Sequence, residues 1–175
     1  MEPVSLFKQA AEGQFRAALQ MLETCLRDCP EQQWTAAIGG FPFWHVAYHI
    51  LFFVDFYLSA NEESFEPWDF QRENYHFFGR LPYPPFETAT ADDPYPRDVL
   101  LDYVDLCREK VRRSLAAETA ESLAGESGFW WYKITRAEFH LNNIRHLQHH
   151  TAQLSLHLRR TSGIDVAWVG TARSE

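Results

Sequence analysis

Cysteine is scarce in this chain of 175 residues, and the three that occur form no recognisable pattern. Cys25, Cys29 and Cys107 are odd in number and include no C-x-x-C pair, which argues against a disulfide framework or a thioredoxin-like redox site. Cys25 and Cys29 have the i, i+4 spacing that could bind a metal ion, but we favour their interpretation as small core residues near a helix end. We therefore expect reduced thiols and a cytoplasmic location.

Positive charge and long apolar runs are lacking too. The chain has 16 Lys and Arg against 24 Asp and Glu, a formal charge of −8, whereas nucleic acids and anionic membranes are bound by basic patches. No apolar run approaches the roughly 18 residues of a membrane span, and the N-terminal sequence lacks the basic-then-apolar order of a signal peptide. We expect neither a nucleic-acid partner nor a membrane. No Ser-His-Asp order, phosphate-cradling glycine loop or dinucleotide fingerprint is present.

Hydrophobic periodicity instead predicts an all-α protein with four long amphipathic helices. The helices are expected at residues 3–28, 43–58, 96–119 and 136–160. A capping box, Thr135-x-x-Glu138, predicts where the last one begins. We expect one domain over residues 1–175, because nothing in the chain repeats and the length is typical of a single domain.

The connection between the second and third helices is unusually long. Residues 61–95 contain five prolines and nine aromatic residues, and a loop of this length in a compact domain is usually functional or wraps the fold. It includes Glu73-x-x-His76, a spacing that di-iron bundles use on core helices; a single copy in a loop is weak support for a ligand pair. A second aromatic cluster, Phe129-Trp130-Trp131-Tyr132, could line a pocket or cover one end of the core.

Histidines gather on the predicted last helix, where five of the eight in the chain occur. His146 and His150 have i, i+4 spacing, which puts both imidazoles on one face, roughly 40° and about 6 Å apart. The same face carries Asn142, His149 and Gln153, beside a separate leucine stripe for packing. Such a row could be a solvated face, a set of hydrogen-bonded core residues, or a metal or catalytic site, and a metal site would need a third ligand.

Two further histidines lie on the most apolar predicted helix. His45 and His49 share a face with Phe52, Phe53 and Phe56. A buried imidazole needs a partner for its nitrogens, or burial costs about 1–3 kcal/mol. A metal ion would be one partner, and a backbone carbonyl or a water molecule would be the ordinary one.

Two motifs together resemble the DinB-like (YfiT-like) family of metal-binding four-helix bundles. They are Trp44-His45-Val-Ala-Tyr-His49-Ile and His146-Leu-Gln-His149-His150-Thr-Ala-Gln153-Leu, the second being similar to the family pattern H-x-x-H-H-x-x-Q-L. The third helix and the tail Ser162–Trp168 also look similar, so the resemblance covers nearly the whole chain. Ala152 departs from the family, which often has Gly there.

The resemblance implies an up-down-down-up bundle in which three histidines hold a divalent ion, most often Zn or Ni. Carried over residue by residue, the ligands are His49, His146 and His150, with His45 a doubtful addition one turn earlier. Hydrogen-bond partners for these imidazoles should lie nearby, and His45, Asn142, His149 and Gln153 are the candidates.

The resemblance also implies a function. Some family members are thiol-dependent S-transferases or metal-dependent hydrolases, and dimers are common among them. We therefore expect a homodimeric enzyme acting on a small molecule, with metal-bound water or a low-molecular-weight thiol as the nucleophile. The alternatives are a metal-binding protein without catalysis and a metal-free interaction bundle.

Overall fold

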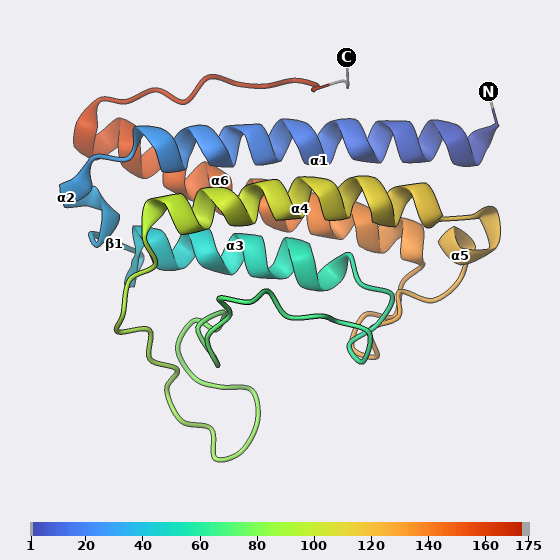
Figure 1. The fold of residues 1–175 in the computed structure, drawn as a ribbon, viewed down its shortest axis with the longest axis horizontal. Helices are drawn as coiled ribbons and strands as arrows, with labels where there is room; N and C mark the ends of the chain where they lie inside the picture. Colours follow the sequence, from blue (N-terminus) through green and yellow to red (C-terminus); the bar gives the residue numbers. More distant parts are fainter. Residues whose placement is uncertain (1, 173–175) are drawn as a thin grey trace.

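Four long helices form the body of the protein in the computed structural model, which describes residues 2–172 (Figure 1). They are α1 (Pro3–Asp28), α3 (Phe43–Tyr57), α4 (Arg97–Ala117) and α6 (Arg136–Ser162). The predicted all-α class is confirmed, and the predicted helix ends lie within two residues of the observed ones. No helix in this described part is long and apolar enough to cross a membrane.

The ends of these helices follow from local sequence. α1 starts at Pro3, where the missing N–H of proline costs nothing. At the start of α6, the Thr135 side chain accepts a hydrogen bond from the Glu138 backbone N–H, at 3.2 Å. The helix stops at Gly163, whose φ of 68° lies in the left-handed region that glycine adopts without a steric penalty.

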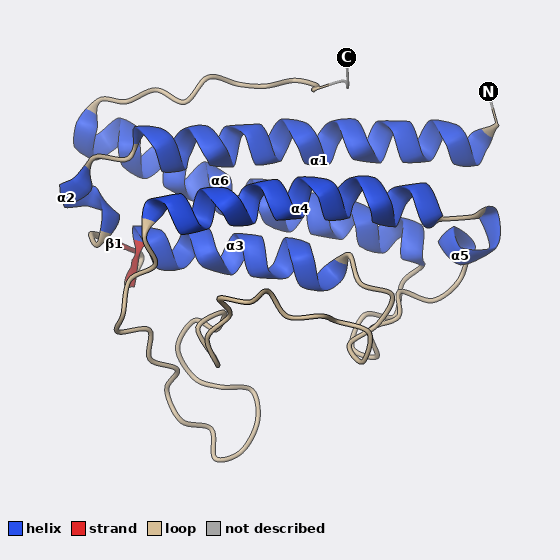
Figure 2. Cartoon of the chain, in the orientation of Figure 1, coloured by secondary structure: helices blue, strands red, loops and turns tan. Residues whose placement is uncertain are grey.

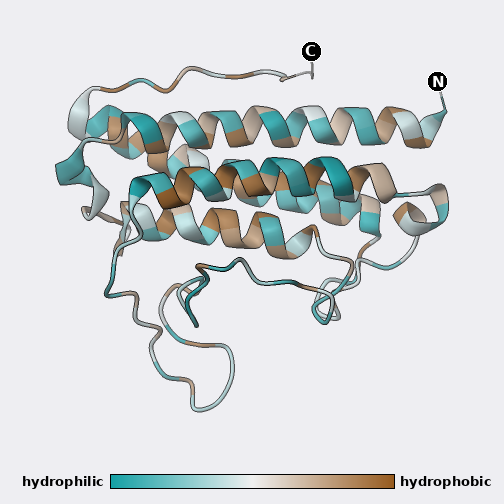
Figure 3. Cartoon of the chain, viewed as in Figure 1, coloured by the Kyte–Doolittle hydropathy of each residue, from teal (hydrophilic) through white to brown (hydrophobic). Residues whose placement is uncertain are grey.

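Each long helix packs against two others. α3 contacts α6 and α4, and α1 completes the ring by contacting α4 and α6. In Figure 1, α1 and α6 run in one direction and α3 and α4 in the other. Figure 3 shows hydrophobic positions interspersed with hydrophilic ones along α1 and α4, as expected for helices that bury one face. The residues of α6 that reach the core include Leu147, Leu154 and Leu158, the predicted leucine stripe.

The sequence did not predict four small elements. These are α2 (Glu31–Trp34), α5 (Ala120–Ala124) and the antiparallel strands β1 (Ala37–Ile38) and β2 (Phe41–Pro42). Figure 2 shows how little of the chain is strand. α2 is held by a hydrogen bond of 2.9 Å from Trp34 Nε1 to the carbonyl oxygen of Tyr95, so it depends on a contact that no local pattern contains.

Residues 58–96 lead from α3 to α4 without a helix or a strand (Figure 2). The segment passes over the outer side of α3 before it reaches α4 (Figure 1). Aromatic side chains fasten it there. The Trp68 ring stacks on Tyr103 of α4 at 4.1 Å, and the His76 ring stacks on Phe52 of α3 at 3.8 Å. The loop is therefore packed against the helices and forms part of the wall around the histidines.

The cysteines are core residues in this structure. Cys25, Cys29 and Cys107 are free thiols with at most 1% of their surface exposed. Burial raises the pKa of Cys25 and of Cys29 to about 12, so both are neutral thiols at physiological pH. Of the two interpretations of the Cys25–Cys29 spacing, the structure favours core packing.

Candidate metal centre

Three histidines from two helices converge between α3 and α6. His49 lies on α3, and His146 and His150 lie on α6 one turn apart. One nitrogen of each imidazole can be chosen so that all three atoms lie within 4.8 Å of one another. The Nε2 atoms of His49 and His146 are 3.1 Å apart. Two nitrogens that each bind one tetrahedral ion at 2.0–2.1 Å would be roughly 3.3 Å apart, so the group is close to ligating geometry.

For two of the three rings, a hydrogen bond decides which nitrogen faces the centre. His49 Nδ1 lies 2.7 Å from the carbonyl oxygen of His76. A carbonyl can only accept, so Nδ1 carries the proton and the Nε2 lone pair of His49 is directed at its neighbours. In the same way His150 Nδ1 lies 2.8 Å from Gln153 Oε1, which leaves Nε2 of His150 free for a ligand.

Burial keeps these imidazoles neutral. It lowers the pKa of His49 to about 2, and the adjacent rings of His146 and His150 act in the same direction. It lowers the pKa of His146 to about 4, again assisted by the His150 ring, and it lowers the pKa of His150. Neutral imidazoles have the free lone pairs that a metal ion needs, so no proton has to leave before the ion binds at pH 7.

Phenylalanines cover the buried sides of the group. The Phe78 ring stacks on His49 with centroids 3.9 Å apart and an angle of 16° between the rings. The Phe53 ring meets both His49 and His146 edge to face, at 4.8 and 5.3 Å. An apolar wall of this kind restricts the access of water to a metal site and sets its local dielectric.

One comparison with known proteins gave a match. The family model described as the DinB superfamily matches residues 14–154, most of the chain. This chain belongs to the DinB superfamily. The matched region includes all three histidines of the group. Comparison with curated proteins and with solved structures gave no match.

The donor set of this DinB-superfamily protein fits a divalent metal ion. Three neutral imidazoles face one point, and two of them are fixed through their other nitrogen, which is how metal-binding histidines are usually held. Imidazole ligands suit Zn, Ni, Cu and Fe better than Mg or Ca, which prefer oxygen. His146 Nδ1 is buried with no hydrogen-bond partner among residues 2–172, and the polar contact of this ring is the 3.1 Å approach of its Nε2 to His49 Nε2.

The other predicted residues occupy different positions around the group. Gln153 contacts His150 directly and lies 3.4 Å from His149 Nε2. His149 is exposed and outside the convergent set. His45 is buried, and its Nε2 lies 2.7 Å from the carbonyl oxygen of Tyr75, so it has the ordinary partner of a core histidine. Asn142 lines a cavity with His146 but forms no hydrogen bond to the three rings within the described chain.

Sequence reasoning missed the contribution of the loop. His76 acts through its main-chain carbonyl, and Phe78 acts through its ring. The Glu73-x-x-His76 spacing drew attention to a loop segment that does contact the site. His76 contributes its main-chain carbonyl, however, and its side chain is not part of the convergent set. Phe53 lies on the predicted phenylalanine face and could have been identified from its spacing of four residues from His49.

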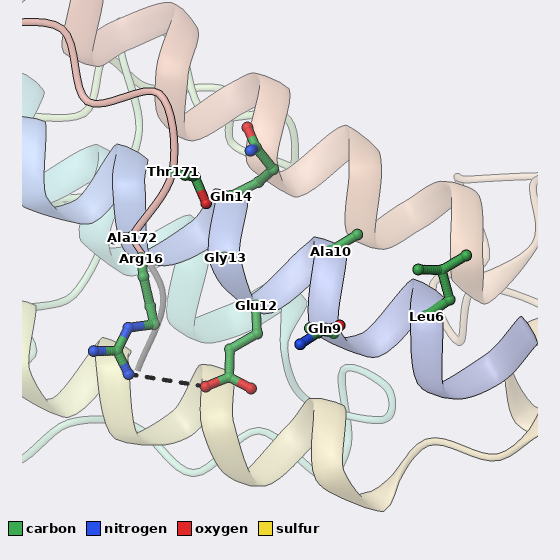
Figure 4. A pocket seen from close by; sticks show the side chains of 9 residues that line it. All are labelled: Leu6, Gln9, Ala10, Glu12, Gly13, Gln14, Arg16, Thr171 and Ala172. Atoms are coloured by element: carbon green, nitrogen blue, oxygen red, sulfur yellow. Dashed lines mark ion pairs between the residues drawn. The ribbon is translucent and has the colours of Figure 1, made fainter. Parts of the chain in front are cut away.

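Two open cavities reach the group from the outside. One of about 700 Å³ has His150 and Gln153 in its wall together with Phe78. Another of about 550 Å³ is lined by His146 and His149. A further depression of about 330 Å³ lies between α1 and the end of the described chain (Figure 4). Its lining includes the ion pair of Arg16 with Glu12, at 3.9 Å, and no histidine, so it is not a candidate for metal chemistry.

Proposed function

We propose that this protein is a divalent-metal-dependent enzyme that acts on a small molecule at the site formed by His49, His146 and His150. The reaction is of the thiol-dependent S-transferase or hydrolase type. The observation that carries the proposal is the convergence of three neutral imidazoles next to two open cavities. A site with three protein ligands leaves at least one position for a water, a thiol or a substrate.

The ion we expect is Zn or Ni. When bound, it would supply a Lewis acid that lowers the pKa of a water or thiol enough to make it a nucleophile near pH 7. In S-transfer, the thiol gives up its proton to solvent and its sulfur bonds to an electrophilic carbon of the substrate. That carbon releases its leaving group with the bonding electrons. In hydrolysis, water takes the place of the thiol.

The residues of this chain position and shield the site. The His76 carbonyl and the Gln153 amide oxygen hold His49 and His150 in the tautomers that present Nε2. The rings of Phe53 and Phe78 pack against His49 and give the site an apolar wall. The open side, where the two cavities meet the imidazoles of His146 and His150, is where a substrate would approach.

The surrounding features belong to the same proposal. We infer that the helices form the up-down-down-up four-helix bundle of the family, that residues 1–175 are one domain, and that the protein is a cytoplasmic homodimer. A low-molecular-weight thiol is the expected co-substrate, and nucleic acids and membranes are not expected partners. The net charge of −8 supports a small, partly apolar substrate over a polyanion.

A second candidate is a metal-binding protein without catalysis. It is favoured by the position of the group, because an ion held by His49 on α3 and His146 on α6 would join two helices that already pack closely. A metal-free interaction bundle is the remaining alternative, and the convergence of three imidazole nitrogens argues against it.

Metal analysis of the untagged protein tests the proposal. Mass spectrometry of wild type should find close to one divalent ion per chain, and His146→Ala should lose it. His149→Ala is the matched control, because its imidazole lies on the same helix outside the convergent set, and it should keep the metal. If both variants retained the ion, the ligand assignment would be wrong.

Activity distinguishes the first two candidates. The metal-loaded protein would be incubated with a small thiol and a chlorodinitroarene, and formation of the thioether would be followed by absorbance. Ester hydrolysis would be assayed in parallel. Turnover that disappears in His146→Ala supports the enzyme. A chelator-induced fall in melting temperature with no turnover of either kind would favour the non-catalytic metal protein.

A further inference from the structure

A cavity of about 730 Å³ lies beside the histidine group without containing any of its three members. Its wall is formed by α3, by the loop that follows it, and by Trp130 and Trp131 from the connection before α6. Small-molecule sites in proteins typically measure about 300–1,000 Å³ and are mostly apolar. In size and lining, this cavity resembles a ligand site.

Aromatic rings make up most of the cavity wall, and several of these rings are exposed to solvent. Trp130, Trp131 and Tyr83 are 74%, 38% and 43% exposed. At the inner end Phe52 and Tyr57 are buried, at 4% and 7%. Exposed aromatic residues that continue into a hollow with a buried aromatic end are unusual on a free surface. Flat faces on several sides favour a flat occupant, because aromatic rings pair by offset stacking and edge-to-face contact.

Two polar atoms in the wall have no partner. Gln71 Oε1 and His76 Nδ1 are both buried, and neither forms a hydrogen bond with any residue from 2 to 172. Buried polar atoms in folded proteins are nearly always paired, so an unpaired one in the wall of a cavity indicates where a ligand would bind. An amide oxygen can only accept. The ligand must therefore bring a donor to Gln71.

We propose that this cavity is a binding site for a planar, mainly apolar molecule that carries a hydrogen-bond donor, such as an aromatic amide. Its ring lies among Phe52, Tyr57 and Trp131, and its N–H group reaches Gln71 Oε1. The nitrogen of His76 offers a second polar contact. Glu62 lies at the wall but is exposed, so the site offers no buried charge that would select an ion.

Two residues of the cavity wall also contact the histidine group. Phe53 lines the cavity and also touches the rings of His49 and His146. His76 contributes its imidazole to the cavity and its carbonyl to His49. If the proposed enzyme function holds, the aromatic group of a substrate would bind in this cavity, next to the metal centre. The binding site itself does not depend on that function, since no metal ligand forms part of its wall.

Two matched probes test the proposal by isothermal titration calorimetry. Naphthamide has the ring and an amide N–H, whereas acetylnaphthalene has the same ring and carbonyl with a methyl group in place of the amide nitrogen. Wild type should bind naphthamide about fivefold more tightly, because one net hydrogen bond changes affinity by that order. Gln71→Met keeps the size of the side chain and removes the acceptor, so the preference should disappear while ring binding remains.

Tryptophan variants test the location. Trp131→Ala should weaken both probes roughly tenfold by removing an aromatic wall. Trp168→Ala is the control, because that side chain is 72% exposed and does not line the cavity, and it should bind as wild type does. Circular dichroism and unfolding midpoints would establish that each variant is folded.

The outcomes separate this proposal from the metal proposal. His146→Ala should keep its affinity for naphthamide even though it loses the metal ion. If wild type bound neither probe at millimolar concentration, or if Trp131→Ala and Trp168→Ala bound equally well, the cavity would not be the site. Equal binding of the two probes by wild type would overturn the assigned donor contact at Gln71.

Discussion

The imidazole of His49 is fastened to the main chain of His76 by a contact of 2.7 Å between Nδ1 and the carbonyl oxygen. A ligand candidate on α3 is thus oriented by a loop residue that lies 27 positions later in the chain. Phe78, two residues further along, stacks on the same ring. The long aromatic loop is therefore part of the candidate metal centre, and substitutions in the loop should change how tightly the ion is held.

Phe78→Ala tests this dependence. Without its ring, His49 loses an apolar cover and the loop loses a contact that holds the His76 carbonyl in place. We expect the metal ion to be released to a chromophoric chelator about 10-fold faster, the lower end of the usual effect of residues around a ligand. Phe70→Ala is the control, because Phe70 lies in the same loop and is 59% exposed. Equal release rates for the two variants would contradict the proposed role of the loop.

Gln153→Leu tests the support of His150. Loss of the amide oxygen leaves His150 Nδ1 without the acceptor that fixes its tautomer. We expect metal affinity to fall about 10–100-fold, measured by competition with a chelator of known affinity. Gln9→Leu makes the same change at an exposed position of α1 and should leave the affinity unaltered. A normal affinity in Gln153→Leu would mean that packing alone orients the ring.

The helices and the histidine group differ in how far the sequence predicts them. The long helices are specified by local apolar periodicity and by caps such as Thr135 and Gly163, which are properties of neighbouring residues. His146 and His150 follow from helical spacing for the same reason. His49 could be selected over His45 only through the family resemblance, because both lie on one face and the choice depends on how α3 is rotated against α6.

The remaining features depend on contacts between distant parts of the chain. The carbonyl of His76 has no sequence signature, since every residue has one. α2 depends on the bond from Trp34 to Tyr95, which is 61 residues away. α5 is capped by the preceding Thr119, whose hydroxyl accepts a hydrogen bond from the Ser122 N–H, and a Thr-x-x-Ser string is a weaker signal than the Thr-x-x-Glu of α6.

Arg136 joins three segments at the end of the bundle near α5. Its Nε donates to Glu118 Oε1 at 3.0 Å, and its other nitrogens donate to the carbonyl oxygens of Tyr57 and Leu58, at 3.3 and 3.2 Å. Both side chains of the ion pair are less than 10% exposed, at 7% and 8%. Arg136→Met would leave the Glu118 charge and the last carbonyls of α3 without this donor.

We expect Arg136→Met to lower the free energy of unfolding by about 3–5 kcal/mol, the usual effect of removing one partner from a buried pair. Urea titration followed by circular dichroism measures it. Arg159→Met is the control, since Arg159 and Asp165 form an exposed pair worth about 0–1 kcal/mol. The double variant Arg136→Met with Glu118→Gln should lose less than the sum of the single losses, because the two residues interact. Strict additivity would argue against the pair.

The same carboxylate predicts how stability responds to acid. Burial alone would raise the pKa of Glu118, but hydrogen bonds from His140, Ser122 and Arg136 outweigh it and lower the pKa to about 2, from its ordinary value of 4.5. A carboxylate whose pKa is lower in the folded state stabilises the protein above its unfolded pKa, and this stabilisation is lost as pH falls through the folded pKa. The contribution of Glu118 should therefore be complete above pH 4.5 and should decline from there towards pH 2. We would measure the free energy of unfolding of the chelator-treated protein across this range, and it should fall less steeply for Glu118→Gln than for wild type. Glu121→Gln is the control, because it changes an exposed residue on α5, and its curve should follow that of wild type. Parallel curves for wild type and Glu118→Gln would show that the carboxylate is not held in its charged form.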